Sequence, residues 1–315
     1  MTTYPSPSGG RRKAPTTDRS WLVVFFVGLA LWGLTVVVTF ATGNANLLPT
    51  LVLLGSFLVP VTFVTWSYDR LGGGSALTPR RILTAFLVGG TLGVLGASVL
   101  ESYFLHPSVW MYVGVGLIEE GVKLAALWLM ALRLTNYTRR DGMVLGAAVG
   151  FGFAALESSG YALTALVTVK GLSLTDLVQT EILRGLLAPF GHGLWTAILG
   201  AVLFSTAARG GRPRLTPVLL GSYLGVAVLH SLWDSMHGIA IALALKLTGS
   251  DWQWRLIDTG YLPQLTQSQA NLILVFQIAG WVVISAAAIL WLRGLVRSPK
   301  VSVPASAGAV APAQH

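Results

Sequence analysis

The chain of 315 residues contains no cysteine and few charged residues. The lack of cysteine excludes disulfide bonds and thiol catalysis. Charged residues make up only 10% of the chain, whereas soluble domains carry about 25%, and 54% of the residues are hydrophobic. The composition therefore excludes an ordinary soluble protein and indicates a protein that crosses a membrane several times.

The apolar residues are gathered in long uninterrupted segments. At 1.5 Å per helical residue, about 20 residues cross a hydrocarbon core of about 30 Å. The sequence predicts an all-α, polytopic transmembrane helix bundle of about eight spans. These spans are residues 21–41, 47–66, 82–100, 109–132, 143–169, 184–207, 217–245 and 271–292.

The positive charge is distributed unevenly between alternate loops. Sixteen of the 21 lysines and arginines lie on one side of the predicted bundle, in the stretches 11–19, 70–81, 133–140, 209–214 and 293–300. Cytoplasmic loops carry the excess of Lys and Arg, so both termini are predicted to be cytoplasmic. The net charge of +9 is then explained by topology, and no nucleic-acid partner is expected.

The two ends of the chain differ from the rest in composition. Residues 1–20 and 298–315 are polar and rich in Pro, Ser, Thr, Gly or Ala, which predicts disordered cytoplasmic tails around a membrane domain of residues 21–297. The first apolar run lacks a clear small-x-small cleavage site, so we expect a retained anchor instead of a signal peptide.

Three charged residues interrupt the fourth span. Glu119, Glu120 and Lys123 are flanked by apolar residues on both sides. Each charged side chain near the bilayer centre costs about 2.5–3.5 kcal/mol on insertion scales, so such residues face partners or a polar cavity. Glu119 and Glu120 point about 100° apart on a helix, so only one of them is expected to face a shared site directly.

Other polar residues lie at a similar depth in the next three spans. Counted from the outer ends of the spans, they fall within roughly 10 Å of one another and of Glu120 along the membrane normal. His230 and Asp234 are four residues apart and share a helix face. The predicted core of the site is therefore formed by the helices of residues 109–245. The residues at this depth are Glu157, His192, His230 and Asp234, and Arg184 lies near the outer end of the sixth span.

Two histidines and several carboxylates from separate helices are a donor set that can hold a divalent metal. Imidazole and carboxylate ligands suit zinc, and a catalytic zinc needs three protein ligands and an open position for water. A remaining glutamate can act as general base, and Tyr161 or Arg184 can stabilise an oxyanion. Without a metal, a glutamate and a histidine could activate water directly.

Other interpretations of the same residues are open. Carboxylates and histidines at mid-membrane depth also relay protons in ion-coupled transporters, and a polar set can serve only helix packing in a scaffold. The glycines at 146, 150 and 152 indicate close helix packing and not a phosphate-binding loop.

Four motifs in order resemble those of the PrsW family of intramembrane proteases, which is related to the CAAX prenyl endopeptidases. The first is similar to E-E-x-x-K and the second to G-F-A-x-x-E-N-x-x-Y. The third contains an arginine, a proline and a histidine, and the fourth is similar to H-x-x-W-N. In this sequence they are residues 119–123, residues 151–161, Arg184 with Pro189 and His192, and residues 230–234.

Two positions depart from that family pattern. Ser158 stands where the family has Asn, and Asp234 stands where the fourth motif has Asn. Both residues keep a hydrogen-bonding group, and Asp234 can add negative charge to a metal site. The resemblance implies a peptidase embedded in the bacterial plasma membrane that cleaves membrane-tethered proteins, such as anti-sigma factors.

The sequence therefore leads to the hypothesis of a membrane-embedded peptidase with a metal-activated water. A proton- or ion-coupled transporter and a non-catalytic scaffold are the alternatives. The expected cofactor is a divalent metal, most simply zinc, and the expected partners are a tethered membrane protein and the lipid bilayer. The predicted metal ligands are Glu120, His192, His230 and Asp234, and the predicted catalytic residues are Glu119, Glu120, Glu157 and Arg184.

Overall fold

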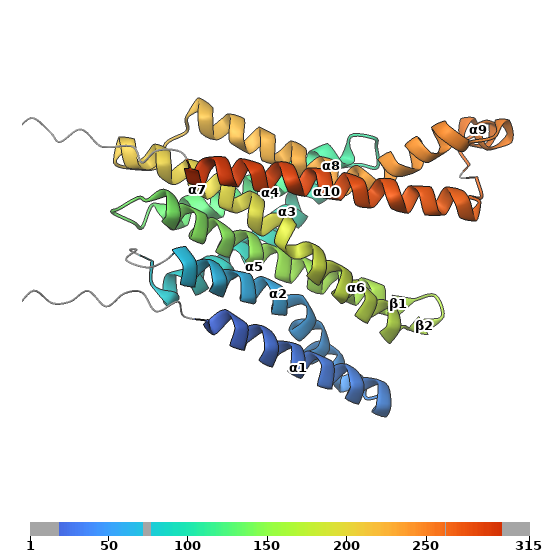
Figure 1. Ribbon diagram of the computed structural model, residues 1–315, viewed down its shortest axis with the longest axis horizontal. Coiled ribbons are helices and arrows are strands. Elements are labelled where there is room, and N and C mark those ends of the chain that lie inside the picture. Colours follow the sequence, from blue (N-terminus) through green and yellow to red (C-terminus); the bar gives the residue numbers. More distant parts are fainter. Residues whose placement is uncertain (1–18, 72–76, 262, 298–315) are drawn as a thin grey trace, which may run out of the picture.

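A computed structural model describes residues 19–71, 77–261 and 263–297 as a bundle of long helices (Figure 1). The predicted tails lie outside the described residues, apart from Arg19 and Ser20. The helices run roughly along one common axis, and α1 and α10 form opposite flanks of the bundle (Figure 1).

The predicted all-α architecture is confirmed for the described residues, with one small exception. A two-stranded antiparallel hairpin follows α5 and pairs Val167 with Leu172. The elements are α1 (Ser20–Thr42), η1 (Ala45–Leu47), α2 (Leu48–Leu71), α3 (Pro79–Phe104), α4 (Met111–Ala131), α5 (Arg139–Leu166), β1 (Val167–Thr168), β2 (Gly171–Leu172), α6 (Leu174–Leu187), η2 (Ala188–Phe190), α7 (His192–Gly210), α8 (Pro217–Thr248), α9 (Asp251–Asp258) and α10 (Gln267–Arg297).

Seven helical stretches of the described chain are long and apolar enough to cross a membrane. The predicted fourth span is not among them, although it forms a helix of 21 residues, α4. The reason is its charge, because Glu119, Glu120 and Lys123 fall in its central turns. The N-terminal end of α1 and the C-terminal end of α10 lie at the same end of the bundle (Figure 1).

Helix α5 is the core of the bundle. In its most apolar stretch 89% of the residues are buried, against 6% for α1. Gly146 and Gly150 lie against the α7 backbone at Thr196 and His192, and Gly152 lies against the α3 carbonyl of Phe86. The predicted packing role of these glycines is confirmed, since a Cβ at any of the three would overlap those backbones.

The predicted sixth span, residues 184–207, is not one continuous helix. Helix α6 ends at Leu187, the 3-10 turn η2 follows, and α7 begins at His192. Pro189 explains the break, because it has no N–H for the helix hydrogen bond and its ring clashes with the preceding turn. The break places His192 at the first position of α7, where its side chain is 13% exposed.

Candidate functional site

The charged residues of α4 are buried inside the bundle. Glu119 is 6% exposed, and Glu120 and Lys123 are fully buried. The Lys123 ammonium has three N–H donors and three acceptors: Glu119 Oε2 at 3.2 Å, Glu120 Oε1 at 2.7 Å and His192 Nδ1 at 2.7 Å. Since an ammonium group cannot accept a hydrogen bond, Nδ1 of His192 is the acceptor and its Nε2 carries the proton.

The second nitrogen of His192 is held by a carboxylate of α5. His192 Nε2 donates to Glu157 Oε2 at 3.0 Å, and Arg184 Nη2 of α6 donates to the same oxygen at 2.6 Å. Arg184 Nε also donates to Ser158 Oγ at 2.7 Å, so the serine that departs from the family pattern binds the arginine. Arg184 therefore fixes Glu157, and Glu157 fixes the orientation of the His192 ring.

His230 of α8 has carboxylates at both of its ring nitrogens. Its Nδ1 lies 2.9 Å from Glu120 Oε1, and its Nε2 lies 3.2 Å from Asp234 Oδ2. Nε2 also lies 3.7 Å from Glu119 Oε2. Glu120 thus orients His230 from behind, in the same way that Glu157 orients His192.

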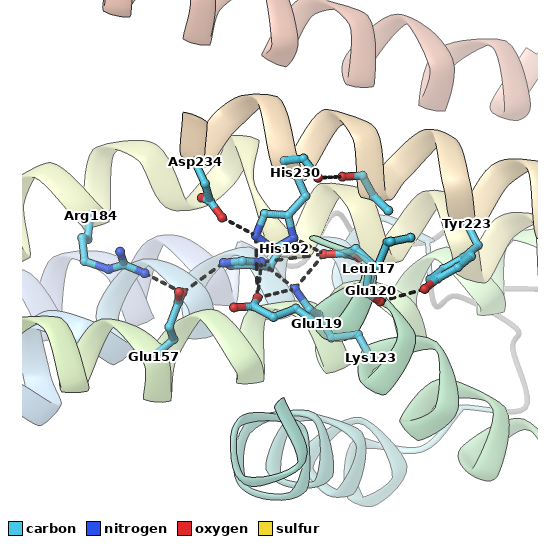
Figure 2. A network of polar contacts seen from close by, with 12 residues as sticks. Leu117, Glu119, Glu120, Lys123, Glu157, Arg184, His192, Tyr223, His230 and Asp234 are labelled. Atoms are coloured by element: carbon cyan, nitrogen blue, oxygen red, sulfur yellow. Dashed lines mark hydrogen bonds and ion pairs between the residues drawn. The ribbon is translucent and has the colours of Figure 1, made fainter. Parts of the chain in front are cut away.

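The histidine nitrogens that do not face Glu157 or Glu120 meet at Glu119 (Figure 2). Glu119 Oε2 lies 3.9 Å from His192 Nδ1 and 3.7 Å from His230 Nε2. Ligand atoms of these three residues all lie within 4.8 Å of one another, and no other such group is found in the described part of the chain. Helices α4, α7 and α8 each supply one of them.

This donor set fits a divalent metal. Two imidazoles and one carboxylate form a known catalytic zinc set, in which ligand atoms about 2.0–2.1 Å from the ion stand about 3.3 Å apart. The three ligand atoms here are within 4.8 Å of one another, so they would move closer together around an ion. The network contains four carboxylates against one lysine and one arginine, a composition that favours a divalent cation. Glu120 Oε2 is a further buried oxygen with no hydrogen-bond partner.

Aromatic rings enclose the site on the side of the core. The Trp195 ring lies 4.8 Å from the His230 ring and 5.5 Å from the His192 ring, and the Phe153 ring lies 4.2 Å from Lys123 Nζ. Trp195 and Phe153 are buried. Sequence reasoning did not select Trp195, although its position three residues after His192 on α7 places the two on neighbouring helical positions.

The site is accessible from the side of Arg184 and Asp234. The side chain of Asp234 is 27% exposed and that of Arg184 25%, whereas Glu120 and Lys123 are closed to solvent. Tyr161 is 52% exposed, and the Arg184 guanidinium stacks on its ring at 4.1 Å.

The structure brings all seven predicted site residues into one connected network. Glu119, Glu120, Glu157, Arg184, His192, His230 and Asp234 are linked in it by hydrogen bonds and ion pairs (Figure 2). His237 lies outside this network, and its Nδ1 is hydrogen-bonded to Gln277 Oε1 of α10 at 3.0 Å. Tyr223, which the sequence did not single out, donates to the Leu117 carbonyl at 2.7 Å and joins α8 to α4.

Comparison with known proteins identifies the family. A family profile described as PrsW family intramembrane metalloprotease matches residues 78–255, and these residues contain the whole network. The "Protease PrsW" of Halalkalibacterium halodurans is 27% identical over 161 residues, which cover 49% of this chain and 69% of that protein. The "Protease PrsW" of Shouchella clausii is 27% identical over 154 residues, 49% of this chain and 66% of the relative. No solved structure matches. The chain belongs to the PrsW family of intramembrane metalloproteases, and it is an integral membrane protease.

Proposed function

We propose that the chain hydrolyses peptide bonds of membrane-tethered proteins at a zinc ion held by Glu119, His192 and His230. The observation that carries the proposal is the convergence of His192 Nδ1 and His230 Nε2 on Glu119 Oε2, at 3.9 and 3.7 Å. In each histidine the opposite nitrogen is bonded to a carboxylate. The carboxylate–histidine–metal arrangement fixes ring orientation and makes the histidine a better ligand.

The proposed ligand set differs from the sequence hypothesis in the choice of glutamate. The sequence favoured Glu120 as the ligand and Glu119 as its support. Glu120 Oε1 is already shared by Lys123 Nζ and His230 Nδ1, at 2.7 and 2.9 Å. Glu119 faces the other nitrogen of His230, Nε2, and also Nδ1 of His192. We therefore assign Glu119 to the metal and Glu120 to the orientation of His230.

A zinc ion at this position would supply a Lewis acid and a water that is nucleophilic at neutral pH. We assign Asp234 the role of proton acceptor from that water, in place of the ligand role that the sequence suggested. Asp234 is the most exposed carboxylate of the network, and its Oδ2 lies 3.2 Å from His230 Nε2. A carboxylate within one hydrogen bond of the water and of the leaving amine can transfer the proton between them.

Arg184 has a second role in this proposal. It has five N–H donors and uses Nε and Nη2 to bind Ser158 and Glu157. Because it is partly exposed on the accessible side, its remaining donors can bind the carbonyl oxygen of the substrate as negative charge develops there. Arg184 thus both positions Glu157 and stabilises the oxyanion.

The proposed substrate is a membrane-tethered regulator, such as an anti-sigma factor. We also propose that α4 crosses the membrane, which gives eight spans and, with the basic loops, cytoplasmic termini. Glu119 lies eight residues after the start of α4, about 12 Å along the helix. Cleavage is then expected in or near the outer half of the membrane.

The test is proteolysis of a tethered reporter by the full chain in liposomes. We expect Glu119→Gln and His192→Ala to abolish cleavage and a chelator to stop the unmodified protein, while His237→Ala retains activity. Full cleavage by either of the first two variants would remove the proposed site. A break in a membrane helix such as η2 also occurs in ion-coupled transporters, so proton flux without cleavage in the same liposomes would favour that alternative.

A further inference from the structure

A second buried carboxylate lies next to the site and is not used by the proposed chemistry. Glu181 of α6 is 4% exposed and precedes Arg184 by three residues. Its Oε2 accepts a hydrogen bond of 2.8 Å from Trp32 Nε1 of α1. Its Oε1 is buried and has no hydrogen-bond partner in the protein. An unsatisfied carboxylate oxygen in the interior of a bundle is unfavourable, so a partner of small size is expected there.

A serine of α2 lies near Glu181 and also lacks a hydrogen-bond partner. Ser56 is 5% exposed, and its Oγ is buried without a partner. Serines in membrane helices commonly donate to the carbonyl four residues earlier, as Ser222 and Ser231 of α8 do here at 2.8 and 2.7 Å. In addition, Pro60 has no N–H to donate to the Ser56 carbonyl. Ser56 therefore brings a hydroxyl that needs a partner, and its carbonyl lacks the usual helical donor at position 60.

A small cavity joins these groups to the site. Its volume is about 10 Å³, and its lining includes Ser56, Glu181, Ser158 and Arg184. One water molecule needs roughly 10–15 Å³ and two to four polar partners. Gly55 also lines the cavity, and a side chain at that position would overlap the Glu181 carboxylate. The size and the polar lining match a single water.

We propose that this cavity is a binding site for one buried water, which donates to Glu181 Oε1 and accepts from Arg184, with Ser56 as its third partner. Glu181 is then a positioning residue that acts on Arg184 through the water. Arg184 already donates to Glu157, and Glu157 accepts from His192. The polar chain would thus extend from Trp32 of α1 to His192 of α7. The effect on activity rests on the proposed function, whereas the water site does not.

The water site is tested by a structure of the full chain in nanodiscs at a resolution that shows ordered water. We expect a density peak within hydrogen-bond distance of both Ser56 Oγ and Glu181 Oε1, absent in Ser56→Ala. Ser67→Ala is the matched control, because Ser67 is buried on the same helix and already donates to the Val64 carbonyl at 2.8 Å. An empty cavity in the unmodified protein, or a protein group bonded to Glu181 Oε1, would overturn the proposal.

The positioning role is tested by Glu181→Leu and Glu181→Gln. We expect Glu181→Leu to lower kcat by roughly fivefold, the effect of about one lost hydrogen bond, with unchanged KM and unchanged bound zinc. Glu181→Gln keeps an acceptor oxygen for Trp32 and turns its NH2 group to the water, which can reorient to accept this bond, so this variant should restore kcat. Unaltered kcat in Glu181→Leu, or loss of zinc in both variants, would contradict this role. If Glu181→Leu does not fold, Ser56→Ala is measured in its place, with the same fivefold effect expected.

Discussion

Lys123 Nζ lies 2.7 Å from His192 Nδ1, the ring nitrogen that faces Glu119. A ring nitrogen has one lone pair, so it cannot accept from a lysine and bind a metal at the same time. The lysine therefore competes with the metal for one ligand. It also holds Glu119 and Glu120 together by ion pairs of 3.2 and 2.7 Å.

Replacing Lys123 should consequently lower the stability of the metal-free protein and raise its affinity for the metal. In Lys123→Gln, the metal-free protein should lose about 3–5 kcal/mol of stability, because two buried carboxylates lose their cation. Zinc should then raise the melting temperature more than in the unmodified protein, since its competitor is gone. The measurement is thermal unfolding in detergent with and without zinc.

The exposed Lys246 of α8 provides the control for that experiment. Lys246→Gln removes the same charge from the surface and should leave both melting temperatures unchanged. An identical response to zinc in Lys123→Gln and the unmodified protein would show that the lysine does not compete for the site.

Gly150 sets the position of His192, because a Cβ at Gly150 would overlap the His192 carbonyl. Gly150→Ala should push α7 away from α5, destabilise the protein by about 1–3 kcal/mol and lower both zinc binding and activity. The matched control is Gly160→Ala on the same helix, where a Cβ meets open space. Alanine there should be neutral or stabilising by up to about 1 kcal/mol. Equal zinc affinity in the two variants would contradict the packing argument.

Glu120 and Glu157, which bond the two histidines, should change the affinity for the metal without binding it. Glu120→Gln and Glu157→Gln are each expected to weaken zinc affinity by about 10- to 100-fold, the usual effect of losing such a partner. Glu119→Gln should weaken it much further because a ligand is lost. Zinc competition titrations measure all three variants. If Glu120→Gln proves more severe than Glu119→Gln, the two glutamates have the opposite roles, as the sequence had suggested.

Much of this site could be predicted from the sequence because charge in an apolar span is rare. The three charged residues of α4, the His230–Asp234 spacing and the similar depth of Glu157 and His192 were sufficient to expect a shared site. The structure agrees, since ion pairs and hydrogen bonds connect these residues.

The remaining features depend on rotation and packing that the sequence does not determine. Glu119 and Glu120 differ by about 100° on α4, so a modest rotation of the helix decides which one faces the histidines. The break at Pro189 was hidden within an apolar run, because hydropathy does not register a missing N–H. Glu181 was overlooked because Trp32, which bonds it, and Ser56, which lines the same cavity, come from helices distant in the sequence.

The central claim is that Glu119, His192 and His230 bind one metal ion. Zinc content and X-ray absorption of the purified full chain test it most directly, with Glu119→Ala, His192→Ala, His230→Ala and His237→Ala measured in parallel. The account predicts one zinc per chain with two histidine ligands, lost in the first three variants and retained in His237→Ala. Stoichiometric zinc in Glu119→Ala or His230→Ala, with an unchanged absorption spectrum, would contradict it.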